Sequence, residues 1–426
     1  MKELVKRILS VALAACMIAV LFTGCSGDKG DSNPTDNAAV TTTDKPTETA
    51  ASDVTLRIYQ GKGEIVDAFA AMCDEYTAET GVKIDIYATA TDATGLLQSY
   101  MSSDEMPAIF TISPGVPFTT YADYLADLSD LQCAGEIYDN MLQKNDAGAV
   151  VGIPFSVEGF GLVYNGNMAT ADDLSTMDSL VSYIETNGTA SLTLSSESYF
   201  LIVHMLSTAF SLQDDPEAFT NDLINGDVTL AGNQAFEDFA TLYAAIRDNC
   251  ENPMSVSYDG ACGNLATGVV AMIHQGNWCI SMFDSYDVSG VDFEMAPLPL
   301  AGNDGLMVGV PNCWCVNSQV SAEEQQAAKD FIDWMYTSDT GKDYLYNQFN
   351  FVPLIDADVS SVELDALSAK MMEYVSAGKT IAWSTYYNPN GIADDLTAVA
   401  ESFFTGTETT AELLEAIQTA YQGYAS

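Results

Sequence analysis

Residues 268–278, which read G-V-V-A-M-I-H-Q-G-N-W, are the stretch from which the fold can be worked out. Residues 269–273 form a continuous apolar run that lies between Gly268 and Gly276. Such a run predicts a strand that is buried on both faces, as is usual in parallel sheets. Ligands of open α/β sheets bind outside the carboxyl ends of the strands, where this segment presents Trp278. A lone tryptophan more often fills a core, so a binding role for Trp278 needs further support.

The segments on either side of this run alternate between strand and helix patterns. Apolar spacing predicts a helix over 64–79, and Ser321 with Glu324 and Thr409 with Glu412 form capping boxes that open two late helices. The predicted strands are 54–59, 82–87, 107–112, 150–154 and 161–164. This alternation predicts an α/β fold with parallel-rich sheets flanked by helices.

The N-terminus carries the pattern of an exported protein. Three basic residues precede an apolar run over 8–22, which predicts a signal peptide over 1–24. Gly24-Cys25 resembles the lipobox of bacterial lipoproteins, in which the cysteine is acylated; the alternative is an ordinary secretory signal that happens to contain Cys25. Residues 25–52 are polar and small, which predicts a disordered tether. We therefore expect an extracytoplasmic protein anchored to the outer face of the cell membrane through lipid on Cys25.

The charge balance restricts the possible partners. Lys and Arg number 14 and Asp and Glu number 60, which gives a net charge of −46. This balance excludes nucleic acids and anionic lipid surfaces, and it favours a neutral or cationic small ligand. The sequence has two histidines, and the cysteine spacings match no zinc or redox template, so we expect no metal and no cofactor. Cys313 and Cys315 should share one face of a strand and pack as small hydrophobes.

Several segments, taken in order, resemble one family of binding proteins. They are 59–63 (Y-Q-G-K-G), 152–158 (G-I-P-F-S-V-E), 197–200 (E-S-Y-F), 268–278, 295–299 (M-A-P-L-P) and 327–332 (A-A-K-D-F-I). Over 54–421 the chain is similar to the extracellular solute-binding proteins of ABC transporters, in the sugar-binding group that includes the maltose-binding protein. The 107–116 region departs from the maltose-type pattern, so maltose specificity is not transferred.

The resemblance implies a two-lobed periplasmic-binding-protein-like fold of type II, with a hinge between the lobes. The lobes it implies are 53–156 with 309–355, and 157–308 with 356–426. Crossovers near 154–158 and 307–311 should act as hinges. The resemblance also implies a monomeric binding protein, not an enzyme, that clasps an oligosaccharide and delivers it to membrane permease subunits.

Two groups of residues are candidates for ligand contact. Polar side chains can hydrogen-bond sugar hydroxyls, and aromatic rings suit the flat C–H face of a sugar. Lys62 is informative because a cation at a helix N-terminus opposes the helix dipole; the alternative is a solvated lysine. We expect Trp278 to support a sugar ring, with Tyr199 beside it. The full set of predicted ligand-binding residues is Gln60, Lys62, Ser113, Glu158, Glu197, Tyr199, Asn277, Trp278, Trp383 and Tyr387.

Two other functional classes stay open from the sequence. The acidic balance fits a binding protein for a cationic ligand such as a polyamine. An extracellular glycosidase would need two carboxylates across a sugar, for which Glu158 and Glu197 are candidates.

Overall fold

A computed structural model describes residues 54–88, 93–355, 358 and 361–425. The predicted signal peptide, the tether and Cys25 lie outside these residues. Within the described part of the chain, no helix is both long and apolar enough to cross a membrane. The described strands form two sheets, each covered by helices, which confirms the predicted α/β class.

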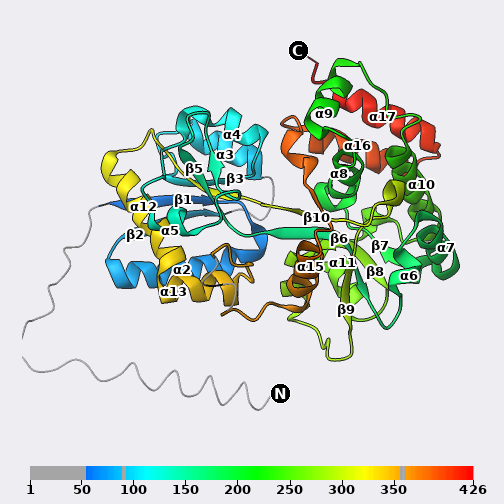
Figure 1. Cartoon of the computed structure of the whole chain (residues 1–426), viewed down its shortest axis with the longest axis horizontal. Coiled ribbons are helices and arrows are strands. Elements are labelled where there is room, and N and C mark those ends of the chain that lie inside the picture. Colours follow the sequence, from blue (N-terminus) through cyan, green and yellow to red (C-terminus); the bar gives the residue numbers. More distant parts are fainter. Residues whose placement is uncertain (1–53, 89–92, 356–357, 359–360, 426) are drawn as a thin grey trace, which may run out of the picture. The chain divides into compact units, whose positions relative to one another are not determined.

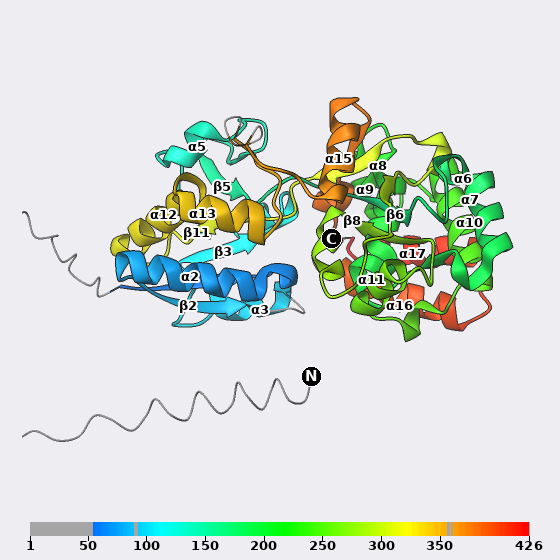
Figure 2. The same ribbon diagram turned by 90° about the horizontal axis from the view of Figure 1, so that it is seen from below.

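The first sheet has the strand order β2-β1-β3-β11-β5-β4. Its helices α2 and α12 pack together, with Tyr76 edge-on to Phe331 at 4.9 Å between ring centroids (Figure 2). The strands are β1 Thr55–Gln60, β2 Lys83–Ala88, β3 Ile109–Ile112, β4 Gln143–Lys144, β5 Val150–Pro154 and β11 Cys313–Val316. The helices are η1 Gly63–Ile65, α2 Val66–Thr80, α3 Ala93–Met101, α4 Val116–Thr120, η2 Ala122–Tyr124, α5 Gln132–Glu136, α12 Ala322–Thr337, α13 Asp339–Asp343 and η8 Tyr344–Gln348.

The second sheet has the order β12-β10-β6-β8-β7, and β9 also pairs with β6. Its strands are β6 Glu158–Asn165, β7 Leu192–Thr193, β8 Met272–Gly276, β9 Phe293–Ala296, β10 Leu306–Gly309 and β12 Thr380–Ala382. Its earlier helices are α6 Ala171–Leu174, α7 Met177–Asn187, η3 Gly188–Ala190, η4 Tyr199–Val203, α8 His204–Ser211, α9 Pro216–Asn225, α10 Gln234–Asn249, η5 Pro253–Ser255 and α11 Tyr258–Ala266. Its later helices are η6 Asn277–Phe283, η7 Leu300–Gly302, α15 Ala366–Ser376, η9 Ser384–Tyr387, α16 Ile392–Thr405 and α17 Thr410–Gln422. Figure 1 shows α16 and α17 near the C-terminal end of the chain, with α10 close to them.

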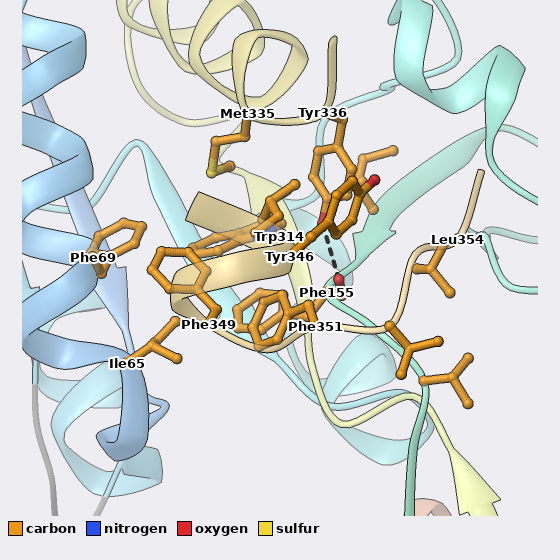
Figure 3. Close-up of a cluster of buried hydrophobic side chains, with 14 of the residues drawn as sticks. Ile65, Phe69, Phe155, Trp314, Met335, Tyr336, Tyr346, Phe349, Phe351 and Leu354 are labelled. Atoms are coloured by element: carbon orange, nitrogen blue, oxygen red, sulfur yellow. Dashed lines mark hydrogen bonds between the residues drawn. The ribbon is translucent and has the colours of Figure 1, made fainter. Parts of the chain in front are cut away.

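One large cluster of buried side chains contains residues of both sheets, such as Ile58 of β1 and Val163 of β6, and a second cluster fills the space between the second sheet and its helices. Around the first sheet, Trp314 stacks on Phe155 with ring centroids 4.1 Å apart and on Phe69 at 5.5 Å (Figure 3). The hydroxyl of Tyr336 donates a hydrogen bond to the carbonyl of Pro154 at 2.7 Å, which ties α12 to the end of β5. Burial of apolar surface is the dominant favourable contribution to folding, and large rings bury the most area per residue.

Several local predictions are confirmed. Both capping boxes are present, with Ser321 and Glu324 at the start of α12 and Thr409 and Glu412 at the start of α17. Cys313 and Cys315 are buried in one apolar cluster, and Trp314 between them belongs to another. All cysteines of the described residues are free thiols.

Two strand predictions need correction. The sheets are less parallel than expected, because β6 and β11 are antiparallel to every strand they pair with. In addition, the buried strand begins at Met272 rather than at Val269, whose side chain is 55% exposed. The reason is the end of α11: Gly268 has a φ of +69°, and the backbone N–H of Val269 donates to the carbonyl of Asn264 at 2.8 Å. This helix ending uses the first residues of the apolar run.

The chain passes between the two sheets at neighbouring places. β5 ends at Pro154 in the first sheet and β6 begins at Glu158 in the second, while β10 and β11 make the return passage. The backbone N–H of Phe155 donates to the carbonyl of Asn312 at 2.9 Å, so these two passages are hydrogen-bonded to each other. The Ser156 hydroxyl accepts from the backbone N–H of Val352 at 2.8 Å, which attaches the segment after η8 to the passage between β5 and β6.

Candidate functional site

The loop after β1 is held by its own side chains. The amide of Gln60 donates to the carbonyl of Lys62 at 2.9 Å and accepts from the Lys62 N–H. The N–H of Gly61 donates to the hydroxyl of Thr111 at 3.1 Å, which fixes the loop against the next strand. Gln60 is fully buried, so its amide serves chiefly to shape the loop that carries Lys62.

Lys62 and Glu158 form a buried ion pair. The Nζ atom of Lys62 lies 2.9 Å from Oε1 of Glu158 and 3.8 Å from Oε2 of Glu64. Lys62 is 9% exposed and Glu158 is 4% exposed, so the interpretation of Lys62 as a solvated lysine is wrong. Lys62 comes from the first sheet and Glu158 is the first residue of β6 in the second, so the pair links the two sheets.

Burial and attraction oppose each other in this ion pair. Burial lowers the pKa of Lys62, but the carboxylates of Glu158 and Glu64 raise it by more, so the net shift is upward. Burial raises the pKa of Glu158, and Lys62 offsets this only in part. Glu64 adds to both upward pKa shifts, because its negative charge favours the Lys62 cation and disfavours the Glu158 carboxylate. Lys62 is therefore firmly protonated, and Glu158 is the partner that takes up a proton on acidification.

Trp278 stands directly after β8, as expected. Its Nε1 donates to Oε1 of Gln275 at 3.0 Å, and its ring lies 5.9 Å from the Nζ atom of Lys62. Gly276 permits this ring position, because a Cβ atom there would lie 2.2 Å from the ring atom Cζ3. Trp383 is edge-on to Trp278, with an interplanar angle of 83° and centroids 6.4 Å apart. The two tryptophans from distant parts of the sequence thus meet beside the ion pair.

Further rings surround this pair of tryptophans. Phe160 in β6 stacks on His204 at 4.5 Å and lies 5.3 Å from Trp383. Tyr199 is 51% exposed, and its ring centroid lies 5.4 Å from that of His204, which in turn contacts the other rings. We call this set the aromatic cluster; it consists of Phe160, Tyr199, His204, Trp278 and Trp383.

Two of the polar candidates are engaged in structural hydrogen bonds. Asn277 is buried; its Oδ1 accepts from the N–H of Gly159, and its Nδ2 donates to the hydroxyl of Ser368, each at 3.0 Å. It therefore connects β6, η6 and α15. Glu197 is exposed, and its Oε1 accepts from the N–H of Tyr258 at 2.9 Å, at the first turn of α11. A carboxylate at a helix N-terminus is stabilising in itself.

Ser113 and Tyr387 are two further predicted contact residues, and neither is a member of the aromatic cluster. Ser113 follows β3 and is half-buried. Burial raises the pKa of Tyr387, and the charges of Glu217 and Asp215 raise it further, which places this tyrosine near the start of α9. The neighbouring Tyr386 instead approaches Trp383, at 6.1 Å between ring centroids.

A small cavity lies beside the ion pair. Its lining includes Lys62, Glu158, Trp278 and Asn350, and its volume of about 20 Å³ is room for about one water molecule. Within the described ranges no group of His, Cys, Asp and Glu is arranged to hold a metal ion. Polar groups, a paired cation and the partly exposed rings of Trp278 and Tyr199 suit hydrogen bonding and stacking with an uncharged polar ligand.

Three residues around the site were not predicted: Phe160, His204 and Tyr386. Phe160 and His204 lie in apolar segments that read as core, and no spacing rule assigns them to a site. His204 is polar within the run L-I-V-H-M-L, which was the only available signal.

Residues 71–372 match the sequence profile of a family described as bacterial extracellular solute-binding protein. No curated protein matches the chain in sequence. Solved structures are similar over most of the chain. One is a sugar transporter of Bacillus licheniformis in complex with stachyose, with a TM-score of 0.71 and 18% identity, covering 87% of this chain and 100% of that one.

Two further structures have the same fold. The solute-binding protein RafE in complex with raffinose has a TM-score of 0.71 and 16% identity, covering 88% of this chain and 100% of its own. A chitin oligosaccharide binding protein has a TM-score of 0.69 and 17% identity, covering 87% of this chain and 98% of its own. At these identities the likeness establishes the two-lobed fold.

Proposed function

Because the chain belongs to the bacterial extracellular solute-binding proteins, we propose that it is the substrate-binding component of an ABC importer and that its ligand is a carbohydrate. The family acts outside the cytoplasm. In this proposal the protein captures an oligosaccharide between two lobes and delivers it to permease subunits in the membrane.

The meeting of Trp278 and Trp383 beside the Lys62–Glu158 pair is the observation that carries the carbohydrate assignment. A sugar presents a flat C–H face and a rim of hydroxyls, which match aromatic faces and paired polar groups. Tyr199 is half-exposed at the edge of the cluster and so is open to a ligand. Three structural neighbours support the same class of ligand: two are complexes with stachyose and raffinose, and the third is a chitin oligosaccharide binding protein.

The proposal assigns residues 53–156 with 309–355 to one lobe, and 157–308 with 356–426 to the other. The passages near 154–158 and 307–311 are the proposed hinges. Their support is that each connects a strand of one sheet to a strand of the other. Closure around a ligand would then change the backbone angles mainly in these segments.

The membrane attachment is also part of the proposal. We infer that residues 1–24 are removed and that Cys25 carries the lipid, so that residues 25–52 tether a monomeric binding protein near its permease. The support is the lipobox-like Gly24-Cys25 after a basic and apolar leader.

A cationic ligand is the second candidate. The net charge of −46 favours it, as does the excess of carboxylate over ammonium where Glu64 and Glu158 surround Lys62. Lys62 argues against it, because its ammonium lies over the ring of Trp278. A glycosidase has less support, because Glu158 is engaged by Lys62 and Glu197 by the first turn of α11.

Titration calorimetry on the purified protein tests this proposal. The panel should contain raffinose, stachyose, chitotriose and xylotriose, with spermidine and putrescine as the cationic arm. Binding of at least one sugar, with no heat from the polyamines, is the expected result. Binding of a polyamine alone would replace the carbohydrate by a cation, and a sugar that is shortened during incubation would indicate an enzyme.

A further inference from the structure

His204 is a buried polar side chain with a ring nitrogen that has no hydrogen-bond partner among the described residues. It is 9% exposed, and the described residues offer its Nδ1 no hydrogen bond. Buried polar atoms are almost always hydrogen-bonded, and each exception calls for an explanation. A ligand group or an ordered water molecule would supply the missing partner.

The backbone around His204 is unusual as well. The segment from Tyr199 to Val203 is a π-helical turn, in which the N–H of His204 donates to the carbonyl of Tyr199. Such turns are rare and are frequently found at functional sites. This turn brings the partly exposed Tyr199 and the buried His204 within 5.4 Å of each other, measured between ring centroids.

The ring of His204 contacts both buried and more exposed members of the aromatic cluster. One face of its ring stacks on the buried Phe160 at 4.5 Å. Tyr199 and Trp278, which are the more open members of the aromatic cluster, lie 5.4 Å and 5.5 Å away. His204 is therefore adjacent to the two rings of the candidate site that are partly exposed.

We propose that His204 is a specificity-determining residue whose neutral imidazole hydrogen-bonds a hydroxyl group of the bound carbohydrate. This inference rests on the proposed function and adds to it a group that recognises a hydroxyl beside the aromatic rings. A site built to hydrogen-bond a hydroxyl rejects an analogue that lacks it far more strongly than an apolar site does.

The charge state of the ring fits this role. Burial lowers the pKa of His204 to about 3, and His274 and Lys62 lower it as well. A neutral imidazole has one donor nitrogen and one acceptor nitrogen, which suits a hydroxyl that can both donate and accept. His274 is the buried reference for His204. Both of its ring nitrogens also lack a partner among the described residues. It is only 2% exposed on β8, and its ring lies edge-on to the buried Phe160 at 5.9 Å between ring centroids.

Imidazole nitrogen resonances give a direct test, because the chain has only two histidines. The full-length mature protein, labelled with ¹⁵N-histidine, is titrated with whichever of raffinose, stachyose or chitotriose binds in calorimetry. We expect the His204 ring signals to shift at saturation and the His274 signals to stay in place. The variant His204→Phe, which loses its own signals, assigns the pair.

The variants separate a ligand contact from a structural role. His204→Phe keeps the ring but removes both nitrogens, so it should melt no lower than the wild type and bind sugar at least about tenfold more weakly. His204→Gln, which can still donate and accept, should recover part of that affinity. A lower melting temperature with unchanged affinity would make His204 structural.

The outcomes separate the inference about His204 from the proposed function. If a sugar binds but the His204 signals stay in place, the inference about His204 is overturned and the proposed function stands. If no sugar binds, both are overturned together. If His204→Phe fails to fold, the titration of the wild type still decides, with His274→Gln used for assignment.

Discussion

Lys62 and Glu158 form a 2.9 Å ion pair that joins the loop after β1 in one sheet to the first residue of β6 in the other. Both side chains are buried, so their attraction has to offset the cost of removing two charges from water. Trp278 lies over the same ammonium group. A ligand held at Trp278 would therefore contact an ion pair that also links the two sheets.

Removing one partner of this ion pair should lower the free energy of unfolding more than removing both partners. In Lys62→Met, Glu158 is left buried without its cation, and the free energy of unfolding should fall by about 3 kcal/mol. Glu158→Gln should cost less, because a neutral amide needs no counter-ion. The double variant should be more stable than the sum of the two single changes predicts, by about 1 kcal/mol or more. Urea unfolding of the four proteins measures these differences.

Lys379 provides a matched control, because it pairs with Asp304 at a similar distance of 2.9 Å on the surface. Lys379→Met should change the unfolding free energy little, since water screens exposed pairs. Equal effects of Lys62→Met and Lys379→Met would show that the Lys62–Glu158 pair is not buried in solution.

The two histidines should make the fold sensitive to mild acid. Burial lowers the pKa of both His204 and His274 to about 3, whereas a histidine in the unfolded chain titrates near 6.5. The unfolded chain therefore binds protons first, and stability is full above about pH 6.5 and falls as the pH drops toward 3. At pH 5 each histidine should therefore have lowered the free energy of unfolding of the protein by about 2 kcal/mol.

Chemical denaturation at pH 7.5 and at pH 5 measures this loss. In His204→Phe, the fall between the two pH values should be smaller by about 2 kcal/mol, because one of the two titrating groups is gone. The difference between the variant and the wild type removes the contributions of the carboxyl groups. An identical fall in both proteins would mean that His204 is not buried as a neutral ring.

The passage between β10 and β11 offers a test of the proposed hinges. The Tyr386 hydroxyl accepts from the N–H of Val310 at 2.7 Å and donates to its carbonyl at 2.9 Å, so it restrains the backbone there. Small-angle scattering should show a smaller radius of gyration at saturating sugar than without sugar. Tyr386→Phe should enlarge the ligand-free radius and leave the ligand-bound one near that of the wild type. No change of radius with sugar would contradict the hinges.

The lipid anchor can be tested in cells. Cys25→Ala removes the proposed acylation site but keeps the leader, so the protein should move from the membrane fraction to the medium or to the soluble extracytoplasmic fraction. Cys73→Ala is a suitable comparison, since Cys73 is a buried free thiol in α2. Release of the wild type and Cys25→Ala to the same extent would rule out an anchor at Cys25.

Local features of the fold could be predicted because they depend on short sequences. The strand Val150–Pro154 and the capping box at Ser321 follow from apolar runs and from one hydroxyl with one carboxylate. The direction of strand pairing could not be predicted, because it depends on where the chain crosses between sheets. The start of β8 was misplaced, because the ending of α11 takes up the residues near Gly268.

The site was predictable in part for the same reason. Trp278 follows a buried strand, so its position could be inferred from the sequence. The burial of Lys62 could not, because it requires Glu158 to arrive from the other sheet. Likewise Tyr386 and Tyr387 are adjacent in sequence, and only the geometry of η9 decides which of the two approaches Trp383.

The position of the Trp278 ring can be changed without altering its chemistry. A Cβ atom at Gly276 would lie 2.2 Å from the ring, so Gly276→Ala should displace the indole. Calorimetry should show sugar affinity falling about 30-fold, as expected for truncation of a central aromatic anchor by Trp278→Ala, with a small change in melting temperature. Gly135→Ala is the control, because a Cβ atom there meets open space. A large fall in melting temperature with affinity intact would instead make Trp278 a core residue.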